Sequence, residues 1–289
     1  MSLDIQKYNS YNVIEIVSAT YKEYIINLDC TNKLKRVTKQ EEISKKRSFE
    51  ELSVIEKVKS LEKKKKDALD NKFKLRRIIN CNYNEKSSFL TLTFRDHYGE
   101  EDVEKANNEL GKFRKRLGRY FKSKELELKY LTTWELTEKG RIHYHLILFD
   151  VPYLNRKKLE SLWGQGFIDI KHIRDNIDNV ALYISKYFTK DLDKKAKYKK
   201  SFFYSQNLKK PVVSKKLLTV DELNNIIVDD EKITYQKEFE SAVYLARDED
   251  GNEIFEKVRK LYIIKEIEKE EKKELSANNS STAKNEEKV

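Results

Sequence analysis

Strand-like and helix-like patterns alternate through the middle of the chain, and this alternation restricts the folds open to it. Runs rich in β-branched and aromatic residues, typical of strands, occupy residues 87–94, 129–136, 141–149 and 167–173. Residues 100–125, 156–166 and 175–192 have the apolar spacing or capping residues of helices. The tight turn TEKGR joins the second and third strand runs as an antiparallel hairpin. The sequence therefore predicts an α+β fold, with helices flanking a central antiparallel sheet.

The two ends of the chain have different patterns. Residues 11–28 contain two short strand-like runs, and residues 39–78 read as a long polar helix with a thin apolar stripe. The stripe consists of Phe49, Leu52, Ile55, Val58 and Leu61. The part after residue 210 reads as less regular, and the last residues have almost no apolar content, which is typical of a disordered tail. We therefore predict an N-terminal extension (1–85), a core (86–210), a C-terminal extension (211–264) and a disordered tail (265–289).

Charge favours a polyanionic partner. Of the 289 residues, 38% are hydrophobic and 38% are charged, and the net charge is +11. This positive surplus makes nucleic acid the first partner to consider. No stretch of the sequence is apolar enough to span a membrane, and the N-terminus lacks the pattern of a secretion signal. We expect a cytoplasmic protein with no membrane partner.

Two of the four histidines stand one residue apart in RIHYHLILFD. On a strand, side chains at i and i+2 point to the same face, so His143 and His145 lie side by side. Two imidazoles on one face can hold a metal ion. The alternative is a pair of histidines packed under the sheet or hydrogen-bonded to neighbours, and the surrounding residues must decide.

A second pattern lies in YISKYFTK, where tyrosines and lysines recur at helical spacing. Tyr183, Lys186, Tyr187 and Lys190 fall at i, i+3, i+4 and i+7, on one face of one helix. Taken alone, such a face is an amphipathic surface with its rings on the core. Beside a metal site it has another interpretation, because a tyrosine next to a divalent cation can cut a phosphodiester.

In this order the motifs FLTLTF (89–94), HYHLILF (143–149) and YISKYFTK (183–190) resemble those of the HUH endonucleases. Within that superfamily they are similar to the two-tyrosine replication initiators of plasmids and single-stranded DNA phages. The resemblance covers roughly residues 86–210 and implies a ferredoxin-like or RRM-like core. It also implies an enzyme that nicks and rejoins origin DNA through a 5′-phosphotyrosine link and leaves a 3′-hydroxyl primer for rolling-circle replication.

The resemblance also implies a set of site residues. The third metal ligand is expected on the preceding strand, where Glu135 can meet the histidines across the hairpin; Glu138 in the turn is less favoured. The ion is expected to be Mg²⁺ or Mn²⁺. Tyr183 and Tyr187 match the two nucleophiles, and Lys186 is expected to stabilise the phenolate or hold the phosphate.

Basic and aromatic residues around this core are candidates for contact with DNA. They are Arg114 and Arg116 in the central helix, and Lys190, Lys194, Lys195, Lys199, Lys200 and Tyr204 after the tyrosine motif. The alternative for the arginine run is a solvated helix face. No P-loop motif occurs in the sequence, so an initiator of this kind would need a separate host helicase as well as a host polymerase.

Other functions remain open at this point. A transposase or relaxase can be built on the same core. A protein that only binds single-stranded nucleic acid would need a sheet with basic flanks, but neither the histidine pair nor a tyrosine facing it.

Overall fold

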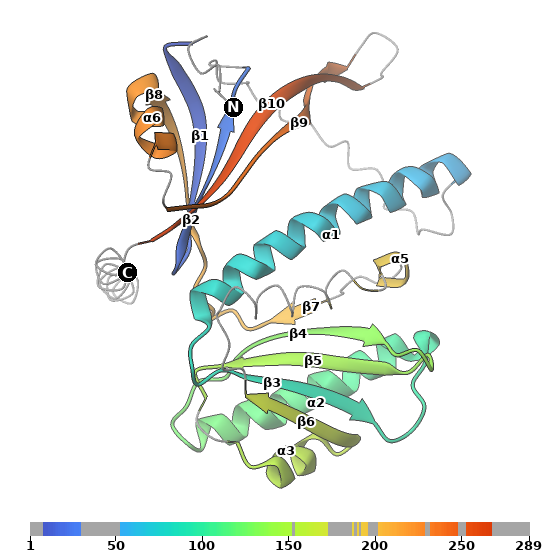
Figure 1. The fold of residues 1–289 in the computed structure, drawn as a ribbon. Helices are drawn as coiled ribbons and strands as arrows, with labels where there is room; N and C mark the ends of the chain where they lie inside the picture. The colour runs from blue at the N-terminus through green and yellow to red at the C-terminus, as the bar shows by residue number, and fades with distance from the viewer. Residues whose placement is uncertain are drawn as a thin grey trace, which may run out of the picture. The chain divides into compact units, whose positions relative to one another are not determined.

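The computed structural model describes most of the chain in two compact units (Figure 1). The described residues are 8–29, 53–151, 154–172, 187, 190, 192–195, 202–228, 232–247 and 253–267. Unit 1 comprises Met1–Lys45 and Pro211–Val289, and unit 2 comprises Lys46–Lys210. Both are built on antiparallel sheets, so the α+β prediction is confirmed.

Unit 2 contains a five-stranded antiparallel sheet in the order β6-β3-β5-β4-β7. Its strands are β3 (Ser88–Phe94), β4 (Lys129–Leu136), β5 (Ile142–Phe149), β6 (Gly166–His172) and β7 (Phe202–Tyr204). The predicted hairpin is the β4–β5 pair. The four predicted strands of this region are present, and β7 adds an edge strand that the sequence analysis did not predict.

Helices α2 and α3 cover one face of this sheet (Figure 1). After a short 3₁₀ turn (η1, Glu100–Asp102), α2 (Val103–Lys122) buries six residues at helical spacing. They are Val103, Ala106, Leu110, Phe113, Leu117 and Phe121. In α3 (Arg156–Trp163), the Asn155 side chain accepts a hydrogen bond from the backbone N–H of Lys158, and left-handed Gly164 ends the helix. Trp134 and Trp163 are fully buried in this layer, as expected for packing residues.

Helix α1 (Val54–Asn82) packs on the other face of the sheet. Its C-terminal part buries Leu75, Ile78 and Ile79 against side chains that include Phe89 and Ile147. The helix therefore begins later than the predicted 39–78 range and ends later, and its packing residues differ from the predicted stripe, in which Val58 is 51% exposed. Of the other stripe residues, Phe49 and Leu52 lie outside the described part of the chain. A short helix, α5 (Leu192–Lys195), follows the sheet strands.

Unit 1 contains a second five-stranded antiparallel sheet, in the order β8-β1-β2-β10-β9. Its elements are β1 (Ser10–Val17), β2 (Tyr21–Asn27), β8 (Val212–Thr219), α6 (Val220–Val228), β9 (Ile233–Arg247) and β10 (Glu253–Glu266). The expectation of little regular structure over 211–264 is therefore wrong. Its strands carry charged residues at alternate positions, which lowered the apolar signal there.

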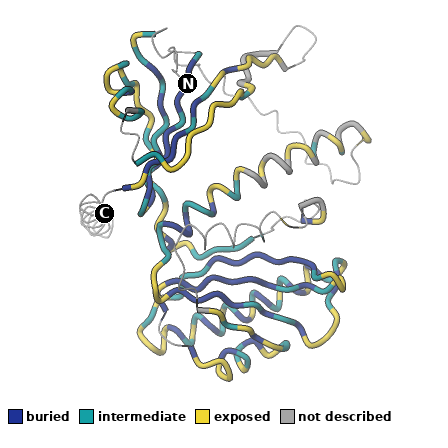
Figure 2. The backbone as a smooth tube through the Cα atoms, viewed as in Figure 1, coloured by how far each residue is buried: buried dark blue, intermediate teal, exposed yellow. Residues whose placement is uncertain are grey.

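Burial is concentrated along the inner strands of each sheet, as the dark tube in Figure 2 shows. The predicted strands in residues 11–28 are β1 and β2, which pair with each other and with strands from the C-terminal part of the chain. The predicted disordered tail lies outside the described residues from 268 onward. Among the helices in the described ranges, none is long and apolar enough to cross a membrane.

Candidate active site

Strand register brings the predicted metal ligands to one face of the unit 2 sheet. His143 pairs with Glu135 on one side and Thr93 on the other, and His145 pairs with Thr133 and Thr91. Paired residues of antiparallel strands point to the same face, so these side chains form two adjacent rows. Tyr144, between the histidines, points into the α2 layer, where its hydroxyl lies 2.8 Å from Oδ1 of Asn107. The site therefore lies on the α1 side of the sheet, beyond the part that α1 covers.

His145 and Glu135 are in direct contact. Nε2 of His145 lies 2.9 Å from Oε1 of Glu135, and both residues are buried, with exposed fractions of 6% and 8%. On the other side of the ring, Nδ1 lies 3.2 Å from the Thr91 hydroxyl. A hydroxyl can donate or accept here, so Thr91 can hold either neutral form of the imidazole. If Thr91 accepts from Nδ1–H, Nε2 presents its lone pair to the carboxylate side of the site.

Lys190 completes an ion pair with the same carboxylate. Its Nζ lies 2.7 Å from Oε2 of Glu135, and the lysine side chain is 48% exposed. Burial by itself would raise the pKa of Glu135, but the contacts and charges of His145 and Lys190 outweigh it and lower that pKa to about 2. Glu135 is therefore a carboxylate throughout the physiological pH range.

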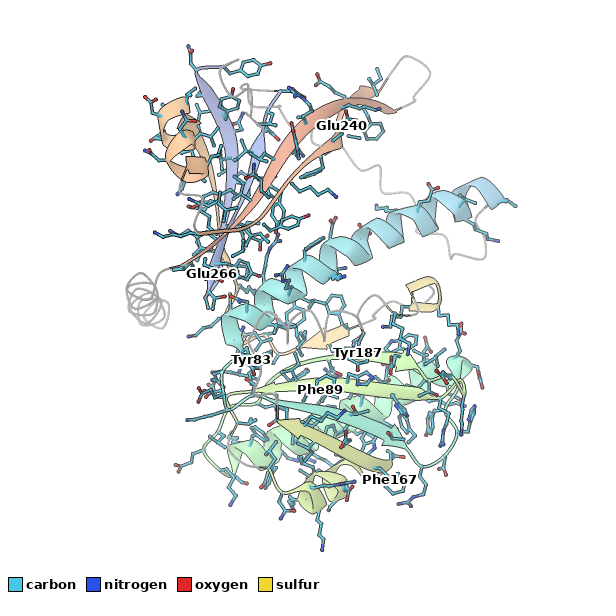
Figure 3. All side chains as sticks on the ribbon, viewed as in Figure 1. Tyr83, Phe89, Phe167, Tyr187, Glu240 and Glu266 are labelled. Carbon is cyan, nitrogen blue, oxygen red and sulfur yellow. The ribbon has the colours of Figure 1, made fainter. Side chains whose placement is uncertain are left out.

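Tyr187 lies on the imidazole. The ring centroids of Tyr187 and His145 are 4.0 Å apart with an interplanar angle of 29°, and Phe89 stacks on both rings (Figure 3). This aromatic stack closes one side of the histidine–glutamate pair. The sequence analysis expected a tyrosine near the histidines, and the structure brings Tyr187 there. Tyr183 and Lys186 lie outside the described residues.

His143 occupies the next position on the same face and is only partly buried. Burial lowers its pKa, and the nearby His145 lowers it further, against the opposing effect of Glu135. A lowered pKa favours the neutral imidazole, which is the form that binds metals.

The donor types suit a divalent cation, although the side chains are not gathered around one. Over the described ranges, no three His, Cys, Asp or Glu side chains are placed to hold an ion. Apart from the ion-pair contacts given above, Nε2 of His145 and Oε2 of Glu135 are buried without a partner in hydrogen-bonding geometry. Buried polar atoms of this kind favour an additional ligand. Two imidazoles and one carboxylate on adjacent strand positions supply that ligand with its donors.

Lys195 has a role that its place in the basic run did not predict. It is only 2% exposed, and its Nζ donates to the backbone carbonyl of Tyr187 at 2.5 Å and lies 3.4 Å from the Thr133 hydroxyl. Lys195 thus ties the chain at Tyr187 to the sheet below the site, rather than presenting a charge to solvent. No local sequence signal predicts this contact, because it joins residues that are adjacent only in the folded chain.

The other predicted DNA contacts have diverse positions. Nη1 of Arg114 donates to the Tyr130 hydroxyl at 2.7 Å, and Arg116 donates to the carbonyls of Leu162 and Trp163. Both arginines therefore tie α2 to neighbouring elements on the far face of the sheet. Lys194 is 45% exposed and lies 3.9 Å from Glu100.

Tyr204 is half-buried in β7, where it packs with the α1 layer. Lys199 and Lys200 lie outside the described residues.

An aromatic residue that sequence reasoning overlooked lies on the same face. Phe167 of β6 pairs with Thr93, which pairs with His143, and its side chain is 57% exposed (Figure 3). A large exposed ring in register with the histidine row is suited to stacking on an unpaired base.

An open antiparallel sheet with a histidine–glutamate pair and a stacked tyrosine is a suitable site for phosphodiester chemistry, and comparison with known proteins gives a consistent result. Residues 87–192 match a family model of replication-associated proteins, described by its member ORF2. This match contains the β3, β4 and β5 rows and Tyr187, and it lies within unit 2.

Two characterised relatives are similar over part of their length. Replication-associated protein ORF4 of Chlamydia phage 1 is 33% identical over 132 residues, which is 38% of this chain and 33% of the relative. The Phasyl DNA replicon protein arp of Escherichia coli is 27% identical over 132 residues, which is 36% of this chain and 44% of the relative. The chain thus spans less than half the length of these relatives. No solved structure matches it significantly.

Proposed function

We propose that this protein is a replication initiator that nicks and rejoins single-stranded DNA at an origin through a tyrosine–DNA intermediate. The observation that carries the proposal is the stack of Tyr187 on His145, whose Nε2 lies 2.9 Å from Glu135. Similarity of residues 87–192 to replication-associated proteins supports the same function.

In the proposed reaction, the phenolic oxygen of Tyr187 attacks the scissile phosphorus. A bond forms between that oxygen and the 5′-phosphate, while the bond from phosphorus to the 3′-oxygen breaks. The phenol loses its proton, and the departing 3′-oxygen gains one to become the 3′-hydroxyl that primes synthesis. Because a phenol has a pKa of about 10, the tyrosine needs a nearby positive charge or base to react at neutral pH.

Glu135, His143 and His145 are the residues that would hold a divalent cation, Mg²⁺ or Mn²⁺. Such an ion supplies charge neutralisation at a phosphate oxygen. The protein's own residues do the remaining work. Phe89 and His145 fix the plane of the Tyr187 ring, Lys195 holds the Tyr187 backbone, and Phe167 offers a stacking surface for a base beside the cut.

Tyr183 is proposed as a second nucleophile on the basis of its spacing from Tyr187. A second tyrosine permits a second strand transfer, in which the strand is cut again and rejoined after a round of replication. Lys186, between the two tyrosines in sequence, is proposed to contact the phosphate. The partners proposed for such a protein are melted origin DNA and the helicase and DNA polymerase of its host, in the cytoplasm.

The test is adduct formation on labelled single-stranded DNA that carries the replicon's origin, with Mn²⁺ or with chelator, resolved on denaturing gels. We expect a metal-dependent covalent adduct that is lost in Tyr187→Phe, or in the double variant with Tyr183→Phe if either tyrosine can react. Tyr144→Phe is a matched control, since Tyr144 lies on the same sheet but faces α2. Binding without an adduct on any origin sequence would instead indicate a nucleic-acid-binding protein without nuclease activity.

A further inference from the structure

The two faces of the unit 1 sheet differ in their surroundings. On one face, Tyr11, Val13 and Ile26 are buried together with Leu223 of α6 and form the core of this unit. The strand register gives the residues of the opposite face. One row across it joins Lys215, Ile14, Ile25, Tyr262 and Lys237, and the next joins Val213, Ile16, Glu23, Ile264 and Tyr235.

Much of this opposite face is accessible at its two edges. Leu217 and Val213 on β8 are 59% and 58% exposed, and Tyr235 and Phe239 on β9 are 45% and 37% exposed. Lys215 and Lys237 are exposed beside them. We call this surface the open face and define it by Lys215, Leu217, Tyr235, Lys237, Phe239 and Lys260.

Charge is separated between the two faces of β9. Side chains alternate along a strand, so Tyr235, Lys237 and Phe239 lie on the open face, whereas Glu238 and Glu240 lie on the α6 side. The basic residues thus stand with the aromatic ones.

Within the rows of the open face the acidic residue is Glu23. It is 2% exposed and accepts a hydrogen bond from the Tyr262 hydroxyl. Glu256 and Glu266 lie at the two ends of β10, away from the lysines. The central part of the open face therefore favours an anionic partner.

The combination of lysines and exposed aromatic rings on an open sheet narrows the class of anion. Lysines contact phosphates without regard to sequence, and aromatic rings stack on bases only when the bases are unpaired. Asn12 and Asn27 lie on the same face, where amides can bond base edges.

We infer that the open face binds single-stranded DNA, a second DNA site in addition to the cutting site of unit 2. The identity of the nucleic acid rests on the proposed function, whereas the face itself does not. The similarity to replication-associated proteins covers residues 87–192, so unit 1 lies outside it and supplies contacts of its own.

The experiment measures binding of the full-length protein to a long labelled single strand over a range of salt concentrations. The logarithm of affinity falls with the logarithm of salt by about 0.7 for each phosphate contact to a single strand. We expect the combined Lys215→Ala and Lys237→Ala variant to reduce this slope by about 1.4. Tyr235→Ala and Phe239→Ala should each weaken binding about 5- to 150-fold, the range for loss of one stacked base.

Matched controls come from the α6 side of the same sheet. Lys257, whose side chain is 82% exposed, lies on that side, as does Phe255, which is 52% exposed. Lys257→Ala and Phe255→Ala make the same chemical changes on the other face. They should leave both the affinity and the salt slope close to those of the wild type.

Several results would overturn the inference. One is equal loss of affinity in the open-face variants and in the controls. Another is unchanged DNA binding together with a change in sedimentation of the open-face variants, which would make this face a contact between two copies of the chain. Cleavage of a short origin oligonucleotide separates the two proposals. Open-face variants that cleave it normally but bind long strands weakly support both, whereas a wild type that forms no adduct while these variants lose binding refutes only the nuclease.

Discussion

Lys190 competes with any divalent cation for the carboxylate of Glu135, because its ammonium lies 2.7 Å from Oε2. Replacing this lysine removes the competitor and leaves the carboxylate charge available. The lysine is 48% exposed, and an ion pair of that kind is worth only about 0.2–1 kcal/mol after screening by solvent. We therefore expect Lys190→Met to tighten Mn²⁺ binding about 1.5- to 5-fold in calorimetric titration.

Lys194→Met is the control for Lys190→Met, since Lys194 is similarly exposed but lies 3.9 Å from Glu100 instead of contacting Glu135. Weaker Mn²⁺ binding by Lys190→Met would contradict the competition and would suggest that the lysine helps to shape the site. Equal changes in both variants would point to a general effect of charge.

Thr91 fixes the orientation of His145 through the contact of its hydroxyl with Nδ1, at 3.2 Å. Thr91→Val keeps the shape of the side chain but removes this partner. The loss of a residue that orients a metal-binding histidine typically lowers metal affinity about 10- to 100-fold. We expect a decrease of that size in Mn²⁺ affinity for Thr91→Val, measured by the same titration.

Thr93→Val provides the comparison for Thr91, because Thr93 lies two residues further along the same strand and on the same face, beside His143. A fall in affinity that is equally large in Thr93→Val would argue against a specific role for Thr91. The two variants also need matching thermal stability, so that the difference reports the site and not the fold.

At the scale of elements, Gly166 sets how closely β6 approaches β3. A Cβ at this position would lie 2.3 Å from the Thr93 carbonyl oxygen and 2.6 Å from the Arg95 amide nitrogen, both of them backbone atoms. Gly166→Ala must therefore push the two strands apart. Overpacking of this type costs about 1–3 kcal/mol, and we expect a fall in melting temperature of about 2–12 °C.

Gly111→Ala is the opposite case for comparison with Gly166. Gly111 lies within α2, and the nearest atom that a Cβ would meet is the end of the Arg114 side chain at 3.8 Å. Alanine in a helix interior is about 1 kcal/mol more favourable than glycine, so this variant should be at least as stable as the wild type. Destabilisation of both variants to the same extent would disprove the close-approach argument.

The elements that could be predicted are those with local signals. The β4–β5 hairpin follows from two apolar runs and a tight turn, and α2 follows from its six regularly spaced apolar residues. The alternation of His143 and His145 correctly placed both on one face. In contrast, β9 carries Lys237, Glu238 and Glu240 among its apolar residues, so the period of two is present but the apolar content is low.

The parts of the site that were missed depend on contacts between distant residues. Thr91 and His145 are brought together by register, and Lys195 reaches Tyr187 and Thr133 only because the chain folds back over the sheet. Lys195 in particular has the sequence context of a solvent-exposed basic run and yet is 2% exposed. A charge run alone cannot distinguish a lysine that faces DNA from one that ties two segments together.

At the scale of the whole molecule, unit 1 is assembled from both ends of the chain. The middle strands β1 and β2 come from residues 10–27, whereas their neighbours β8 and β10 lie more than 180 residues further along. Such pairing has no local signature, which explains why the sequence suggested two separate extensions. It also means that the N-terminal strands are structurally necessary for the C-terminal half of the chain.

Removal of residues 1–29 should therefore unfold unit 1. The deletion takes away Tyr11, Val13, Tyr24, Ile26 and Leu28, each buried in the core of this unit. Full burial of one such side chain stabilises by about 1.5–3 kcal/mol, so the combined loss matches or exceeds the 5–15 kcal/mol that typically holds a domain together. We expect limited proteolysis to cut the truncated protein within residues 212–267 and to leave residues 88–149 protected, because the unit 2 sheet keeps its own core. Adding a synthetic peptide of residues 1–29 should restore protection, whereas protection that persists without the peptide would show that β8, β9 and β10 fold without their partners.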